Sequence, residues 1–276
     1  MNDIQATEDY TPIIKKIKRG KTIVMIVTIV VLMVLIIIAM PQKIEILEKT
    51  VYQTNGMHPA LFILLLIVVF LAELFALGLV LSPLQKSLNE ECDPRKYYVL
   101  NKLFNRNRKR LLIVYSGAYF YLGDYPSLFE CSEQMIASGN SSLRFCGLFG
   151  KARGSYFTGD YETLTATAKQ FDDELAGAGR IGKKQRAVLE NWAENMHLLI
   201  ALSKNDIDAV NRYRNIEAWA VSKAAEGYVN YLKGFAATLA GDDEEAIYRF
   251  KSVTDHCGKT VFARMAEELL KGRNSK

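Results

Sequence analysis

The chain contains little cysteine and little histidine for its length. Four cysteines in 276 residues cannot build a disulfide scaffold, and none has the C-x-x-C spacing of a metal or redox site. The three histidines show neither a triad nor metal-ligand spacing, and the adjacent pair His256 and Cys257 lacks the second ligand pair of a zinc site. No phosphate-binding loop with Lys and Ser/Thr is present. We therefore expect no enzyme, and no catalytic, cofactor-binding or metal-binding residues.

A strong charge imbalance is also missing. The 35 basic and 30 acidic residues give a net charge of +5, which is too weak to indicate nucleic acid binding. Because half of the residues are hydrophobic, the chain is too apolar for a disordered protein. The mean hydropathy of +0.02 is typical of a soluble protein, but it is misleading. Much of the apolar excess lies in two blocks within the first 82 residues.

Each block is long enough to cross a lipid bilayer. Residues 22–40 contain no charged side chain, and 19 helical residues extend close to the ~30 Å of a bilayer core. Residues 60–82 are interrupted only by Glu73. A buried soluble helix would keep a polar face, and a signal peptide would need a small-residue cleavage site where Met40-Pro41-Gln42 stands. We predict transmembrane helices at 22–40 and 60–82.

Basic residues beside the two blocks predict the orientation. Five Lys or Arg residues lie in the basic N-terminal segment 1–21, two lie in the connection 41–59, and four follow the second block. Because basic flanks stay on the cytoplasmic side, we expect both termini in the cytoplasm and 41–59 as a short external loop. The sequence thus predicts a two-span protein of the cell membrane that contacts lipid through its spans and basic flanks.

Residues 83–106 are predicted to form a juxtamembrane helix. Asp93-Pro94 is a good helix start, with the aspartate as cap and the proline in the first turn. A basic run follows at 105–110, which either attracts anionic lipid or forms a solvated turn.

The remaining segment, 107–276, contains a repeated turn. A Gly or Asn that can end a helix is followed each time by an Asp that can cap the next one. The spacings between the four turns are 36, 46 and 36 residues, with ten extra residues around 172–186, where we expect a longer loop. The turns are Gly123-Asp124, Gly159-Asp160, Asn205-Asp206 and Gly241-Asp242.

This pattern resembles the tetratricopeptide repeat over roughly residues 107–255. A small residue precedes three of the turns, and the last copy matches best, with Gly234, Ala237, Ala246 and Phe250 at the family's packing positions. The family's early tryptophan and closing proline are absent from all four copies. The alternative is a generic helical bundle with chance Gly-Asp turns. The preferred fold is all-α: a transmembrane hairpin followed by an α-solenoid of about four helix pairs.

The resemblance implies that the inner helices line a groove for a protein or peptide partner. The positions that we expect to contact such a partner in the cytoplasm are Tyr119, Tyr156, Asn195 and Asn230. The pattern Gly177 to Gly182 is a literal dinucleotide-binding motif, but no strand is expected before it, so we interpret it as accidental.

Glu73 is the one ionisable residue inside a predicted span. It lies at a depth similar to Thr28 of the other span, which could donate a hydrogen bond to it. Three interpretations stay open: packing against an intramembrane helix partner, a tolerated protonated or snorkelling residue, or ion and proton handling. The sequence therefore favours a membrane-anchored scaffold or adaptor. The alternative is a subunit of a membrane enzyme or transport complex that uses Glu73.

Overall fold

A computed structural model describes residues 10–39, 42–46, 49–53, 59–179, 181–212 and 222–274 of the chain. The chain divides into two compact units. One runs from Thr7 to Pro83, and the other contains Leu84–Lys276.

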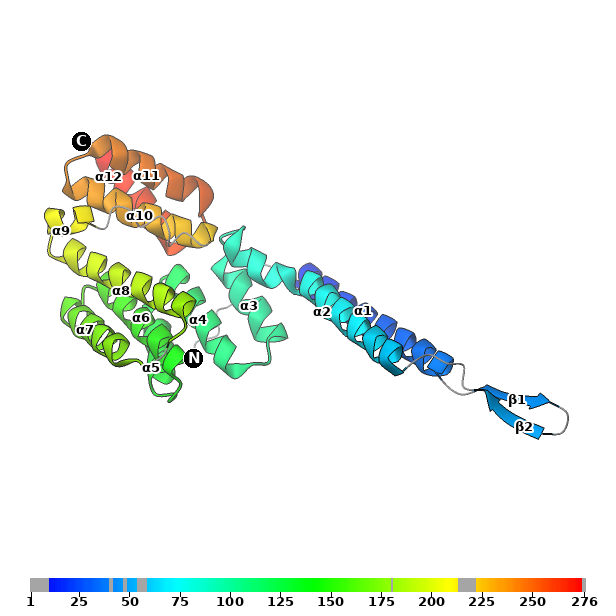
Figure 1. Cartoon of the computed structure of the whole chain (residues 1–276). Coiled ribbons are helices and arrows are strands. Elements are labelled where there is room, and N and C mark those ends of the chain that lie inside the picture. Colours follow the sequence, from blue (N-terminus) through cyan, green and yellow to red (C-terminus); the bar gives the residue numbers. More distant parts are fainter. Residues whose placement is uncertain are drawn as a thin grey trace. The chain divides into compact units, whose positions relative to one another are not determined.

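The first unit is built from two long helices joined through a β-hairpin (Figure 1). Helix α1 spans Thr11–Ala39 and α2 spans Pro59–Asn89, and both are long and apolar enough to cross a membrane. Helix α1 therefore begins well before residue 22, and α2 continues through Pro83 into the second unit. The two helices pack closely at Gly20, where an added Cβ would lie 3.0 Å from Cγ1 of Val80.

The connection expected as a loop at 41–59 contains two strands. Strands β1 (Gln42–Ile46) and β2 (Lys49–Gln53) pair antiparallel, with Gln42 opposite Gln53 and Ile46 opposite Lys49. The sequence explains the difference, because 42–46 alternates polar and β-branched residues and 49–53 contains Thr, Val and Tyr in a row. The all-α prediction holds for the other secondary structure that the model describes.

The second unit consists of helices that pack consecutively on one another. Helix α4 also contacts α6, and α6 contacts α8, so these three form an inner layer. Helices α10, α11 and α12 pack together, and α12 returns to contact α4. The helices, shown in Figure 1, are α3 (Pro94–Phe104), α4 (Arg108–Leu122), α5 (Tyr125–Ile136), α6 (Ser141–Thr158), α7 (Tyr161–Gly177), α8 (Lys183–Ser203), α9 (Ile207–Arg212), α10 (Lys223–Leu239), α11 (Asp243–His256) and α12 (Val261–Asn274).

The four repeated turns share one backbone geometry. The first residue of each turn has a left-handed backbone, with φ between 53° at Asn205 and 78° at Gly159. The aspartate that follows accepts a hydrogen bond from a backbone N–H three residues later, and these aspartates are Asp124, Asp160, Asp206 and Asp242. Each dipeptide thus ends one helix and begins the next, as expected from their chemistry.

The small residue before the last turn is required by packing. A Cβ added to Gly234 on α10 would lie 2.6 Å from the ring of Phe250 on α11, and Phe250 is completely buried. The two helices therefore approach closely only because position 234 has no side chain.

The expected longer loop around 172–186 is mostly helix. Helix α7 continues to Gly177 because Phe171 and Leu175 extend its buried face, and α8 begins at Lys183. The dinucleotide-like pattern therefore follows a helix rather than a strand, so it lacks the context of a nucleotide site.

Candidate functional site

The residues expected to line a partner groove lie on α4, α6, α8 and α10. Only 2% of Tyr119, 3% of Asn195 and 8% of Asn230 is exposed, whereas Tyr156 is half-buried. Three of the four positions are thus almost completely buried in this structure. The physical reason is that neighbouring helices lie directly against these side chains.

The two buried asparagines connect helices. Oδ1 of Asn195 accepts a hydrogen bond of 3.0 Å from the hydroxyl of Tyr228, and Oδ1 of Asn230 accepts one of 2.9 Å from Nη1 of Arg249. Both bonds satisfy polar groups in the interior, which would be costly to leave unpaired. These residues support the structure of the helical unit.

Helix α12 closes the helical unit onto its beginning. The ring of Phe262 lies 5.2 Å from the ring of Phe120 and 5.1 Å from that of Tyr228. Nη2 of Arg264 donates a hydrogen bond of 3.2 Å to the carbonyl oxygen of Leu122. The last helix therefore covers the C-terminal end of α4.

Arg153 on α6 is the most unusual polar residue of this region. Its guanidinium carbon lies 3.9 Å from the ring centre of Phe120 and 4.1 Å from that of Phe149. Nε is buried without a hydrogen-bond partner, and no carboxylate in the described ranges forms an ion pair with the guanidinium. Burial lowers the pKa of Arg153, but an arginine keeps its charge in a protein. A cation is thus held between two aromatic faces, and no anionic side chain of the described residues pairs with it.

An aromatic surface continues from this arginine. Phe149 stacks on Trp192 of α8, with ring centres 4.8 Å apart and an angle of 2° between the planes. Phe149, Arg153 and Trp192 are each half-buried as whole residues, and Nε of Arg153 is fully buried. We define this trio as the arginine–aromatic site. The sequence interpretation missed it, although Phe149 and Arg153 stand one helical turn apart, as residues that share a helix face do.

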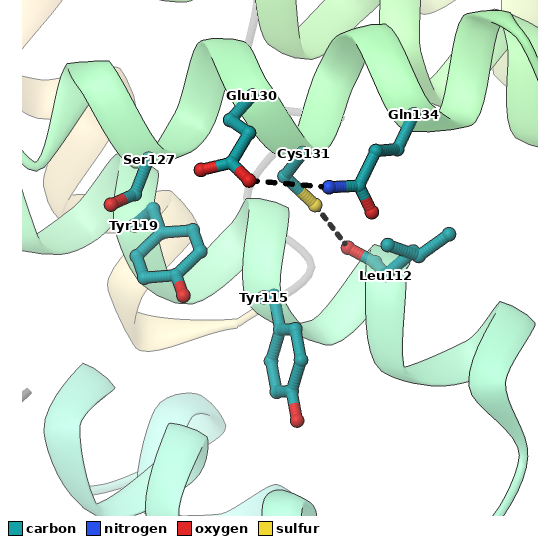
Figure 2. A pocket seen from close by; sticks show the side chains of 7 residues that line it. All are labelled: Leu112, Tyr115, Tyr119, Ser127, Glu130, Cys131 and Gln134. Carbon is teal, nitrogen blue, oxygen red and sulfur yellow. Dashed lines mark hydrogen bonds between the residues drawn. The ribbon is translucent and has the colours of Figure 1, made fainter. Parts of the chain in front are cut away.

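A small cavity lies between α4 and α5 (Figure 2). Its volume of about 20 Å³ is enough for one water molecule. Sγ of Cys131 donates a hydrogen bond of 3.2 Å to the carbonyl of Leu112, and burial raises the pKa of this thiol to about 12. Such a thiol is poorly reactive at neutral pH. The lining residues, all labelled in Figure 2, are Leu112, Tyr115, Tyr119, Ser127, Glu130, Cys131 and Gln134.

A larger and more polar depression lies between α10 and α11, with a volume of about 360 Å³. Arg249 crosses it and is held by Oε1 of Glu245 at 2.7 Å and by Asn230. The charges of Glu226 and Lys233 also line this depression. Because its cations and anions are mixed, it favours no single class of ligand.

Glu73 and Thr28 lie on different helices of the first unit. Both side chains are half-buried, and the structure forms no hydrogen bond between them. The interaction suggested by their similar depth is therefore not formed in this structure. Glu73 remains an ionisable group on an otherwise apolar stretch of α2.

His197 has a partner that the sequence interpretation did not identify. Its Nε2 lies 3.0 Å from Oδ2 of Asp172 on α7, and both side chains are about 40% exposed. Within the described ranges, no cluster of three or more His, Cys, Asp or Glu residues could hold a metal ion.

No protein-family model, curated protein or solved structure matches this chain.

Proposed function

We propose that the protein is a membrane-anchored adaptor whose helical unit binds a protein partner in the cytoplasm. The observation that carries the anchor is the exposure of apolar side chains along α1 and α2, where the most apolar window of each helix has no buried residue. Ile37 is 66% exposed, for example, and Phe75 is 71% exposed. An apolar surface of this size is unfavourable in water and is satisfied by lipid. The basic flanks support the orientation with both termini in the cytoplasm.

The helical unit is, on this proposal, a degenerate tetratricopeptide-like solenoid. Its support is the recurring turn geometry together with the contacts of α4 with α6 and of α6 with α8. In such an array each helix pair buries its apolar face on the next pair, and the inner helices present a continuous surface. Closure by α12 covers one part of that surface.

The partner surface that we infer is the arginine–aromatic site. An arginine without a carboxylate partner in the described chain favours an anionic group, and the stacked rings of Phe149 and Trp192 provide apolar area beside it. A protein segment with a carboxylate next to an apolar side chain has matching chemistry. Arg binds carboxylates with two parallel hydrogen bonds, which adds directional specificity.

The substitution Arg153→Gln tests this function in the full-length protein. Partners captured from detergent-solubilised membranes are compared by quantitative mass spectrometry with those of the wild type. Removal of a charged hydrogen-bond partner costs about 1.5–3 kcal/mol, so we expect at least a tenfold loss of the specific partner.

Arg144→Gln is the matched control, because Arg144 lies on the same helix but pairs with Glu174 through two nitrogen atoms. Its capture should stay at the wild-type level. Equal capture of the partner by the two variants would contradict the arginine–aromatic site. Release of the protein from membranes by alkaline extraction would contradict the anchor.

A second candidate function rests on Glu73, which has no hydrogen-bond partner in the described part of the chain. The protein would then be a subunit of a membrane enzyme or transport complex. Glu73→Gln keeps the shape of the side chain and removes its charge. Loss of activity of the assembled complex would favour this function, and loss of assembly would favour a packing role for Glu73.

A further inference from the structure

Two buried cysteines that are far apart in the sequence meet in the helical unit. Sγ of Cys92 lies 3.3 Å from Sγ of Cys257, and 165 residues separate them in the chain. Only 1% of Cys92 and 2% of Cys257 is exposed. A disulfide bond needs its sulfur atoms about 2.05 Å apart, so movements of little more than 1 Å would bring these two atoms to bonding distance.

Both cysteines lie where the backbone is specialised. Cys92 follows the end of α2 and has a left-handed backbone, with φ of 50°, which is uncommon for a residue other than glycine. Cys257 is the C-cap residue of α11. Its sulfur packs on Gly227 of α10, where an added Cβ would lie 2.5 Å from Sγ. Any larger residue at 227 would displace the Cys257 thiol.

A second contact holds the same two segments together. Nζ of Lys259 lies 2.8 Å from Oδ2 of Asp93, and the side chain of Asp93 is only 4% exposed. Asp93 is also the N-cap of α3, where its carboxylate accepts a hydrogen bond from the backbone N–H of Lys96. The cysteine pair therefore belongs to an ordered junction between the α2–α3 connection and the C-terminal helices.

We propose that Cys92 and Cys257 are an oxidation site, at which a peroxide converts the two thiols into an intramolecular disulfide. This inference goes beyond the adaptor function and does not depend on it. The disulfide would join the connection after α2 to the end of α11 covalently. The junction, which is otherwise noncovalent, would thereby stay covalently linked until a reductant cleaves the disulfide.

The reaction is balanced with hydrogen peroxide as the oxidant. The thiolate of Cys92 attacks one peroxide oxygen, the O–O bond breaks, and the leaving hydroxide takes up a proton to become water. The sulfur of Cys257 then attacks the resulting sulfenic acid, the S–S bond forms, and the second oxygen leaves as water with the Cys257 proton. Two electrons pass from the sulfur atoms to the peroxide, which becomes two water molecules.

The surroundings of the cysteines favour the thiolate at Cys92 and disfavour it at Cys131 and Cys146. The hydrogen bond between the sulfur atoms of Cys92 and Cys257 lowers the pKa of Cys92, and the charge of Lys223 acts in the same direction. By contrast, burial raises the pKa of Cys131 to about 12 and that of Cys146 to about 11. Because the thiolate is the nucleophile, Cys92 should be oxidised before the other two.

The test uses the full-length protein, reduced, in detergent. After treatment with hydrogen peroxide and denaturation, maleimide labelling followed by intact-mass measurement counts the free thiols. We expect two of the four thiols of the chain to disappear, a peptide cross-link between Cys92 and Cys257, and recovery of both thiols with dithiothreitol.

Two variants provide the controls. The double variant Cys131→Ala/Cys146→Ala should still form the cross-link, whereas Cys92→Ala should keep all its remaining thiols. Circular dichroism checks that each variant keeps the helical content of the wild type. Four free thiols in the oxidised wild type, a cross-link that joins other cysteines, or sulfinic acid on Cys92 without a cross-link would each overturn the proposal. Peptide mapping of the wild type decides the question even if a variant does not fold.

Discussion

The two units of this chain use helices in opposite ways. In the first unit, α1 and α2 leave apolar side chains exposed along most of their length, and the two helices pack closely near Gly20 and Val80. In the second unit each helix buries one face, and the N-termini of several helices are capped by side chains such as Asp124 and Asp160. The proposed membrane anchor accounts for this difference, because lipid satisfies an apolar surface, whereas water requires that surface to be buried.

Replacing one exposed valine in each unit by aspartate should show the difference between the two units most clearly. Val30 on α1 is 52% exposed and Val188 on α8 is 47% exposed, so the two differ mainly in their surroundings. At the centre of a transmembrane helix an aspartate costs about 2.5–3.5 kcal/mol. We therefore expect Val30→Asp to reduce membrane insertion strongly, as measured by alkaline extraction.

Val188→Asp should change stability by no more than about 0.5 kcal/mol, which is usual for a surface position exposed to water. Equal effects of the two substitutions, on insertion and on thermal unfolding, would contradict the assignment of different surroundings.

Two glycines, one in each unit, test how tightly the helices pack around them. Gly234→Ala places a methyl group against the buried ring of Phe250, and overpacking of this kind costs about 1–3 kcal/mol. Gly78 on α2 has no atom within 4 Å of an added Cβ, so Gly78→Ala should cause no loss. Thermal unfolding of the full-length protein measures both. A Gly234→Ala variant as stable as the wild type would show that α10 and α11 can separate without cost.

The smallest expected effect concerns acid stability of the helical unit. Hydrogen bonding to Arg144 lowers the pKa of Glu174 below its ordinary value of 4.5. A carboxylate with a lowered pKa stabilises the folded state above its unfolded pKa, and this contribution disappears as the pH falls through the folded pKa. The pair is partly exposed, so its contribution is about 0.2–1 kcal/mol.

The difference in unfolding temperature between the wild type and Arg144→Gln should therefore be smaller below about pH 4.5 than at pH 7. A difference that stays constant with pH would show that the ion pair does not contribute. At pH 7 the wild type should be the more stable of the two.

Local patterns predicted the two apolar helices and the four turns, because those features depend on neighbours in the chain, whereas α1 begins earlier and α7 ends later than expected. The Gly-Asp turns combine one residue that accepts a left-handed backbone with one that caps a helix, and both preferences act within four residues. The β-hairpin between α1 and α2 was missed although its residues have strand propensity. The short alternating stretch was interpreted only by its place between two apolar blocks.

The candidate sites depend on contacts between helices, which the sequence alone does not provide. Tyr119, Asn195 and Asn230 fall on the inner helices, but how much of each is exposed depends on the helices that cover them. Nothing in the sequence distinguishes Arg153 from other basic residues, which are common on helices. Only the aromatic rings from α4 and α6 and the missing carboxylate make it distinctive.

The sequence by itself determined the apolar blocks and the four turns, because hydrophobic length, glycine conformation and aspartate capping are local properties. The tertiary structure alone decided that α12 returns to α4, that Arg153 lies between two phenylalanines, and that Cys92 meets Cys257. Each of these contacts joins residues from different helices, and side-chain packing, rather than any sequence spacing, selects which residues meet.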